Sequence, residues 1–391
     1  MGLLIDIFYN GVLAILVALW ILGTRPARVG SFVSALKKYR RVVAGLLWAV
    51  FIVFASCFVL YFDYFDEVHD IDEAVEGGAA AAADGLNPYV VPVVPRFMER
   101  YSENLTWSNG TYNYLPLDLI VYTAAREVFG FLGAPVWFVA VNLLFSAGAF
   151  YLFRELVRVR WLSYLPFAGI VMLFYAFDNA SLTILLIVAS MYCYKRLRSY
   201  PEAIAILLMT LAALTKAYAV FPLAVLVLFE LQKAVASRNL VSFSRVAVAS
   251  AMGAGICLAV ILPFGFTEVL DSAVFFHASE DARVGTSFGG TLLAEVALDS
   301  DLFTYAAAAV VGLALVSSFL LRNMNDRVLL VIMAFMLVSV KSSQGTLTVA
   351  GIFLAIRLRE LADARKAAAQ KMQASPLPAE NSSTEATAQG E

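Results

Sequence analysis

Residues 42–62 read VVAGLLWAVFIVFASCFVLYF, and the acidic stretch DYFDEVHDIDE follows at 63–73. The apolar run contains no charged residue, and about 20 apolar residues make a helix that crosses the core of a bilayer. No Lys or Arg occurs from Val42 through Pro95, so the carboxylates beyond the run gather at one membrane face. Together the two stretches predict a membrane helix that ends in an acidic loop.

The composition extends this membrane prediction to the whole chain. Of 391 residues, 61% are hydrophobic and 15% are charged, and the mean hydropathy is +0.79. A soluble protein could not hide that much apolar surface from water. The net charge of -2 gives no sign of a nucleic-acid partner. The three cysteines lie in apolar stretches without CxxC spacing, so neither a disulfide framework nor a zinc site is indicated.

Clusters of basic residues between the apolar runs indicate the topology, because short loops rich in Lys and Arg stay in the cytoplasm. The resulting fold class is an all-α polytopic membrane protein with about eleven transmembrane helices and a dipping helix at 115–129. Its long outer loops are expected to carry interfacial helices. The runs up to the second long loop are about 8–22, 42–62, 134–153, 161–177, 180–194, 202–215, 217–231 and 246–264, and further hairpins follow.

This topology divides the chain into three parts. Residues 1–41 form an extra N-terminal helix and a basic cytoplasmic loop, and residues 42–357 form the transmembrane domain, with outer loops at 63–115 and 265–301. Residues 358–391 are predicted to be a disordered cytoplasmic tail. The tail composition from about residue 374, rich in Ala, Ser, Thr, Glu and Gln, cannot bury enough apolar area to fold.

The same topology brings chemically useful side chains from distant parts of the sequence to the outer face. Polar groups at membrane depth are costly and are usually kept for a purpose. Each has a simpler alternative: most loop carboxylates are solvated, a lysine between apolar runs can snorkel, and a histidine beside aromatic residues can simply pack. The side chains brought together are Asp70, Asp72, Lys216, His277, Arg283 and Lys341.

Short motifs in this set resemble the GT-C class of integral-membrane glycosyltransferases, and within it the polyprenyl-phosphomannose-dependent mannosyltransferases. The resemblance starts with Asp72 beyond an outward span, a Gly-Ala helix, and a Gly-x-x-Pro-Tyr turn at 85–89 that contains Asn87 and Tyr89. It continues with Tyr114-Leu115-Pro116-Leu117, where Leu117 replaces the second proline of the family pattern. Further similar segments are residues 214–222, with a displaced proline, and Phe276-His277 followed by Arg283 and Ser287, with a longer spacing.

The resemblance implies a reaction in which a hexose, mannose by default, moves from a polyprenyl-phosphate donor to an acceptor hydroxyl with inversion. It implies Asp72 as the general base, with Asp70 as the alternative. Lys216, Arg283, His277 and Lys341 would stabilise the donor phosphate, and Asn87, Tyr89 and Tyr114 would bind substrate. The expected partners are the lipid-linked sugar, a glycan, glycolipid or glycoprotein acceptor, and the bilayer, with the site on the extracytoplasmic side of the cell membrane.

No metal or cofactor is required by this scheme. Asp70, Asp72 and His69 could hold a divalent cation, but ligands adjacent in one loop lack the distributed geometry of a tight site. A Gly-rich phosphate loop before a helix is missing from the sequence, which argues against a nucleotide-sugar donor. The alternative functions are a transporter or flippase of lipid-linked sugar and a structural subunit without activity.

Overall fold

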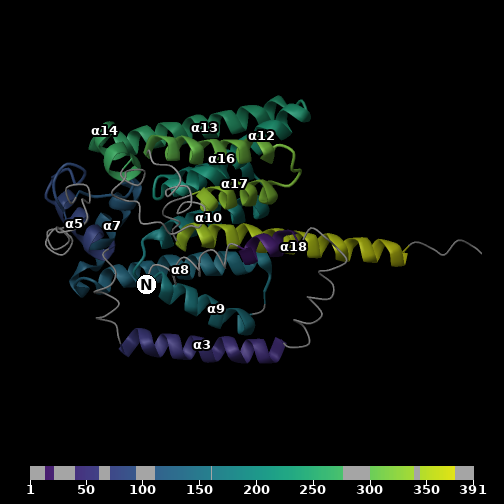
Figure 1. Ribbon diagram of the computed structural model, residues 1–391, viewed down its shortest axis with the longest axis horizontal. Coiled ribbons are helices and arrows are strands. Elements are labelled where there is room, and N and C mark those ends of the chain that lie inside the picture. The colour runs from purple at the N-terminus through teal and green to yellow at the C-terminus, as the bar shows by residue number, and fades with distance from the viewer. Residues whose placement is uncertain are drawn as a thin grey trace, which may run out of the picture.

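The computed structural model describes residues 14–21, 40–60, 71–93, 111–159, 161–275, 300–338 and 344–374. Over these residues the chain is helical, with turns between helices and no strand (Figure 1). Three helical segments are long and apolar enough to cross a membrane, namely Val136–Val157, Ala217–Ala236 and Leu240–Phe264. The structure therefore supports the expectation of a helical membrane protein. It does not test the predicted number of about eleven spans.

The helices follow the predicted apolar runs closely. The predicted dipping helix is present as a helix of 14 residues, and the Ala-rich stretch after Asp72 is a helix as expected. In chain order the helices are α3 (Arg40–Leu60), α5 (Ile71–Ala83), α7 (Pro116–Phe129), α8 (Val136–Val157), α9 (Trp161–Phe174), α10 (Ala180–Arg196), α11 (Pro201–Ala213), α12 (Val220–Ala236), α13 (Leu240–Ile261), α14 (Phe266–Leu270), α16 (Ser300–Ser318), α17 (Met324–Val338) and α18 (Gln344–Ala374).

Local sequence explains several of the helix starts. Pro116 is the first residue of α7 and Pro201 the first of α11, positions where the missing N–H of proline leaves no hydrogen bond unmade. Asn239 caps α13, because its side chain accepts a hydrogen bond of 3.0 Å from the backbone N–H of Ser242. Asp178 accepts one of 2.8 Å from the N–H of Ala180, the first residue of α10.

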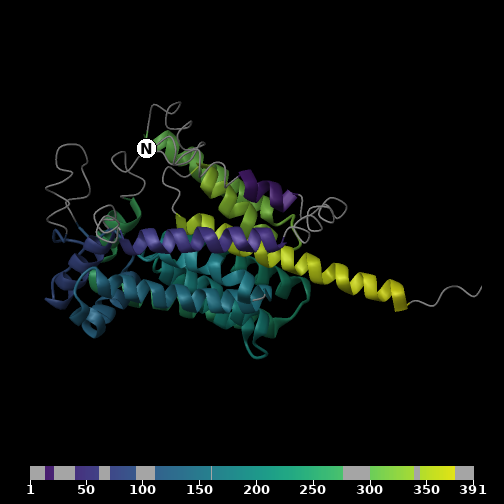
Figure 2. The same ribbon diagram turned by 90° about the horizontal axis from the view of Figure 1, so that it is seen from below.

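Most of the long helices run side by side along the long axis of the molecule, with α10 in the middle, whereas α16 and α17 are inclined to that axis (Figures 1 and 2). Helix α10 packs against α8, α11 and α18, while α17 lies between α12, α16 and α18. Their shared core includes Ile187 and Met191 of α10, Ile206 of α11 and Phe353 of α18. Helix α3 contacts mainly α9 and lies at the edge of the bundle.

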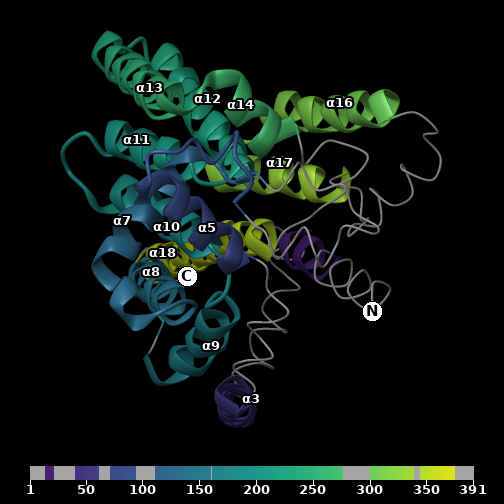
Figure 3. The same ribbon diagram turned by 90° about the vertical axis from the view of Figure 1, so that its left-hand side faces the viewer.

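Helices α5 and α7 cover one end of this bundle, seen from the front in Figure 3. Helix α5 can lie close to the segments around Val93 and Tyr112 because it carries glycine at the two positions that face them. A Cβ on Gly77 would lie 1.8 Å from the carbonyl oxygen of Val93, and one on Gly78 would lie 2.4 Å from Cδ2 of Tyr112. Glu76 fixes the same helix by accepting hydrogen bonds of 2.6 Å from Arg126 and 2.7 Å from Trp137.

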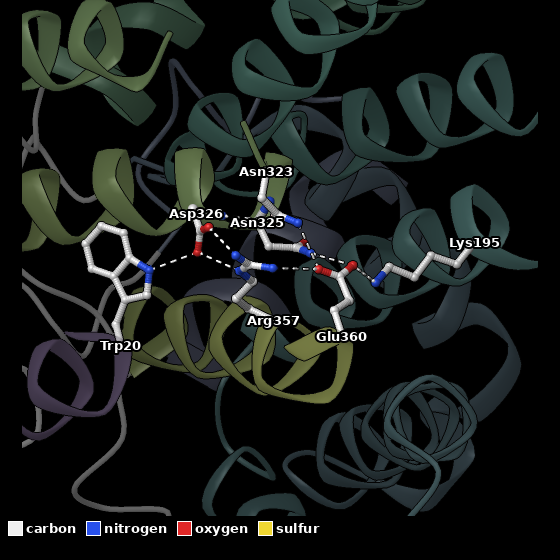
Figure 4. A network of polar contacts seen from close by, with 7 residues as sticks. All are labelled: Trp20, Lys195, Asn323, Asn325, Asp326, Arg357 and Glu360. Atoms are coloured by element: carbon white, nitrogen blue, oxygen red, sulfur yellow. Dashed lines mark hydrogen bonds and ion pairs between the residues drawn. The ribbon is translucent and has the colours of Figure 1, made fainter. Parts of the chain in front are cut away.

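A network of charged and polar side chains joins helices toward the opposite end (Figure 4). Two nitrogens of Arg357 each lie 2.9 Å from a different oxygen of Asp326, and the indole N–H of Trp20 donates to Asp326 over 2.9 Å. Glu360 accepts hydrogen bonds from Lys195, Asn323 and Asn325. All four carboxylate oxygens have partners, so this network connects residues 14–21, α10, α17 and α18.

The last helix differs from the prediction. Helix α18 continues to Ala374, so residues 358–374 of the expected disordered tail are helical, and the helix extends beyond the bundle (Figure 2). Its continuation is stabilised by side-chain pairs spaced three or four residues apart, such as Arg359 with Asp363 at 3.0 Å. The rest of the tail, residues 375–391, lies outside the described residues.

Candidate functional site

Three segments that are far apart in the sequence meet beneath α5 and α7. They are the approach to α7 (residues 111–118), the turn before α10 (175–179) and the turn after α11 (214–216). The backbone N–H of Leu117 donates to the carbonyl of Leu214 over 3.2 Å, which joins the first segment to the third. The side chain of Asn179 joins the second to the first through Asp118. The three segments are thus joined by one backbone hydrogen bond and one hydrogen bond between side chains.

Asp118 is the centre of the junction. Its side chain is fully buried, and one oxygen, Oδ2, accepts hydrogen bonds from the Tyr112 hydroxyl at 2.8 Å and from Nδ2 of Asn179 at 2.7 Å. The other oxygen, Oδ1, has no hydrogen-bond partner in the part of the chain described here. A buried acceptor that forms no hydrogen bond lowers the stability of the fold by on the order of 1–3 kcal/mol, and by more if the group is charged. Such a group in a native protein calls for an explanation, and a bound ligand is one.

The environment of Asp118 also perturbs its ionisation. Helix α7 lies outside the three segments that are long and apolar enough to cross a membrane. Burial raises the pKa of Asp118 from 3.8 to about 6, while the charge of Lys216 and the two hydrogen bonds to Oδ2 act in the opposite direction. The side chain therefore gains and loses its proton near pH 6, well above the usual range of an Asp. Perturbed carboxyl groups of this kind are common at binding and catalytic sites.

Lys216 supplies a cation next to this carboxyl group. It lies in extended conformation between α11 and the short helix Ala217–Ala219, and its Nζ lies 3.9 Å from the ring centre of Tyr114. Among the described residues no carboxylate oxygen lies within 4.0 Å of that nitrogen. Burial lowers the pKa of Lys216, and the charges of Asp178 and Asp118 counteract this. The ammonium group is thus held over an aromatic ring without a direct anionic partner.

Lys216 is unusual for its position in the molecule. Within the described ranges the other basic residue near α7 is Arg126, and it is paired with Glu76. The remaining basic side chains with ion pairs, including Lys195 and Arg357, lie near the far ends of α8, α10, α12 and α13 or along α18. A ligand anion near α7 would therefore find Lys216 available.

A second layer of buried polar groups supports the junction from behind. Asn142 of α8 accepts a hydrogen bond of 2.5 Å from Ser181 and another from Tyr122, and it donates to the carbonyl of Ala176 over 3.2 Å. This layer connects α7, α8 and the start of α10. It holds the turn 175–179, and hence Asn179, in a fixed position relative to Asp118.

The residues predicted to bind substrate differ in what they contact. Asn87 donates to the carbonyl of Phe264 over 2.7 Å and accepts from the N–H of Tyr89, and the Tyr89 hydroxyl donates to the carbonyl of Tyr114 over 2.7 Å. Asn87 and Tyr89 are therefore engaged within the chain and hold Tyr114 in place. Tyr114 itself contacts Lys216, so the structure brings these two predicted site residues together.

The predicted catalytic and phosphate-binding residues are only partly covered. Asp72 is the second residue of α5, which packs against α7, but its side chain lies outside the described residues. The other predicted site residues, Asp70, His277, Arg283 and Lys341, also lie outside them. Their roles remain predictions.

Sequence reasoning assigned no role to Asp118, Asp178 or Asn179. Asp118 lies within the predicted dipping helix at 115–129, and the other two lie between the predicted runs 161–177 and 180–194. Two signals pointed to them: Asp118 follows directly after the Tyr-Leu-Pro-Leu motif, and Asp178-Asn179 interrupts two long apolar runs. Neither signal states that Asn179 donates to Asp118, because the residues are 61 positions apart.

Comparison with protein-family models, curated proteins and solved structures gives no match for this chain. Within the described residues, no three His, Cys, Asp or Glu side chains come together as a metal site would need. The chemistry of the site is thus read from its own groups: one cation, one carboxyl group with an unused oxygen, and supporting hydroxyl and amide groups.

Proposed function

We propose that this protein is a membrane glycosyltransferase that moves a hexose from a polyprenyl-phosphate donor to an acceptor hydroxyl. The proposal includes a GT-C-like domain of about eleven spans and a site on the extracytoplasmic side of the cell membrane. Mannose is the default sugar because the resembling family uses it. The donor is a lipid-linked sugar, and the acceptor is a glycan, glycolipid or glycoprotein.

The observation that carries the proposal is that Lys216 and Asp118, two groups close enough to influence each other's charge, lie at one end of an apolar helical bundle. Lys216 is a cation without a direct anionic partner in the described residues, and Asp118 has a buried oxygen without a donor. A sugar phosphate offers both complements, since phosphate is an anion and sugar hydroxyls are hydrogen-bond donors. The apolar bundle supplies a surface along which the lipid chain of the donor can lie.

In the proposed reaction the acceptor hydroxyl attacks the anomeric carbon, and the polyprenyl phosphate leaves with an additional negative charge. A carboxylate accepts the proton of the acceptor, and Asp72 is the proposed base, with Asp70 as the alternative. The N-terminal position of Asp72 in α5 supports this, because a helix N-terminus favours the ionised form of a nearby carboxyl group. Lys216 stabilises the departing phosphate, a role worth a factor of roughly 100–1,000 in rate for one well-placed group.

The test is transfer of radiolabelled hexose from a polyprenyl-phosphate hexose to acceptors extracted from the same membranes. We expect Lys216→Met to lower the rate by about 100-fold, and Asp72→Asn or Asp70→Asn to abolish it. Lys366→Met is the matched control, because it removes the same charge from an exposed side chain of α18. Transfer that survives Lys216→Met and both aspartate substitutions would refute the assignment.

The same assay separates the proposal from a flippase of lipid-linked sugar. A flippase would move the intact donor across a vesicle membrane and leave the hexose on its polyprenyl phosphate. Scrambling of the donor without any new glycoside bond would therefore replace the enzyme proposal with the transport one.

A further inference from the structure

Two buried oxygens at the junction share one property, because each is a hydrogen-bond acceptor without a partner among the described residues. Oδ1 of Asp118 and Oδ1 of Asn179 are both fully buried and both lack a hydrogen-bond partner in the described part of the chain. Because Nδ2 of Asn179 donates to Oδ2 of Asp118, the amide is oriented with its oxygen as a free acceptor. The two side chains therefore present two acceptor oxygens without a partner in the described residues, beside the second N–H of the Asn179 amide.

The chemistry of these atoms restricts what can bind to them. A phosphate group is itself an acceptor with negative charge, and it would be repelled by Asp118. A metal ion would need further ligands, and the described residues contain no group of three His, Cys, Asp or Glu that could hold one. A neutral hydroxyl group donates one hydrogen bond without bringing charge, and it can satisfy a buried carboxylate oxygen.

The contrast with the polar network near α18 supports a ligand role. In that network both oxygens of Asp326 and both oxygens of Glu360 have partners within the protein. Asp118 is equally well held by two donors, but both donors use the same oxygen. The arrangement fixes the carboxyl group in orientation and keeps the second oxygen available.

We infer that Asp118 and Asn179 form a hydroxyl-binding subsite for the sugar of a sugar phosphate whose phosphate lies at Lys216. This inference rests on the proposed function and adds the part of the substrate that each residue recognises. The ligand approaches from the Lys216 side, because Lys216 is only half-buried whereas Asp118 is enclosed. Asp118 is thereby a binding residue for the donor sugar, and the proton of the acceptor goes to a different carboxylate.

Binding to the full-length protein in detergent tests the inference, with two probes that differ only in the sugar. The probes are a short-chain polyprenyl phosphate and the same lipid carrying mannose on its phosphate. We expect wild type to prefer the mannosylated lipid, and Asp118→Asn to weaken its binding about 10- to 100-fold, as expected for one lost hydrogen bond to a charged group. Binding of the bare lipid phosphate should not weaken. Lys216→Met should weaken both probes.

Two controls keep a folding defect from imitating this result. Asp363→Asn makes the same acid-to-amide change on an exposed side chain of α18 and should leave both affinities unchanged. Tyr112→Phe removes one donor from Oδ2 but keeps Oδ1, so a preference for the mannosylated lipid should remain. Each variant is compared with wild type by its unfolding temperature.

The outcomes distinguish the subsite from the proposed function. Equal affinities of wild type for the two probes, or equal losses of both in Asp118→Asn, would overturn the subsite. Lost transfer with an unchanged preference in Asp118→Asn would also overturn it and make Asp118 the base. Hexose transfer without a binding preference for the mannosylated lipid would support the proposed function and contradict the subsite. A binding preference for the mannosylated lipid without hexose transfer would support the subsite and contradict the proposed function.

Discussion

Replacing Asp118 with Asn should change how stability depends on pH. In the fold, burial raises the pKa of Asp118 from 3.8 to about 6, so the folded protein binds this proton more tightly than the unfolded chain does. The stability contributed by the protonated side chain is complete below pH 3.8 and is lost as the pH rises through about 6. A difference of about two pKa units corresponds to about 3 kcal/mol.

Asparagine has the shape of the protonated side chain and no proton to lose. Its amide oxygen can accept from Tyr112 and Asn179 as Oδ2 does now. The free energy of unfolding of the ligand-free variant, minus that of wild type, should therefore increase by about 2 kcal/mol between pH 4 and pH 7 and stay level above that range. At neutral pH the variant should be the more stable protein, even though it binds the sugar less well.

Tryptophan fluorescence during heating, at one scan rate and at several pH values from 4 to 8, measures this difference in detergent. Asp363→Asn corrects for the change in net charge, because that side chain is exposed at 46% and lies on α18. If the stability of Asp118→Asn minus that of wild type stays constant over the pH range, or decreases as the pH rises, Asp118 is not a buried carboxyl group with a raised pKa.

Two further substitutions test how the site and the bundle are held together. Gly78→Ala would place a Cβ 2.4 Å from Cδ2 of Tyr112 and displace the donor to Asp118, so the unfolding temperature and hexose transfer should both fall. Gly45→Ala, whose Cβ would meet nothing within 4 Å, should change neither, and equal effects of the two would contradict this packing. Arg357→Met leaves Asp326 largely buried with only Trp20, and should reduce the free energy of unfolding by about 3 kcal/mol. Arg359→Met breaks an exposed pair and should cost less than about 1 kcal/mol, and a similar loss in both would argue against the network.

The sequence was sufficient for the helices and for their order. Runs of apolar residues bounded by charges predicted α8 to α13 within a few residues, because a helix in a bilayer satisfies its own backbone and needs only apolar side chains outside. Pro116 and the Ala-rich stretch after Asp72 likewise predicted the start of α7 and the whole of α5. The end of α18 was misjudged, because a polar composition does not exclude a helix that continues from a buried one.

The candidate site was only partly predictable. Lys216 and Tyr114 were selected from their motifs, and the structure brings them into contact. Asp118 was present in the same motif, yet a carboxyl group in a sequence looks the same whether it is solvated or buried. Its environment comes from Tyr112, Asn179 and the turn at Leu214, and these contacts depend on how α7, α10 and α11 pack.

By itself the sequence determined that this is an apolar helical chain with an acidic segment after residue 62, since hydropathy and charge order are local properties. The tertiary structure decided which carboxyl group is enclosed and which of its oxygens has no donor among the described residues. Burial and hydrogen bonding depend on neighbours from distant segments, and those neighbours are chosen by packing. For this reason the carboxyl group at the centre of the junction is Asp118, which the sequence alone does not single out from the many carboxylates of the acidic stretch at 63–73.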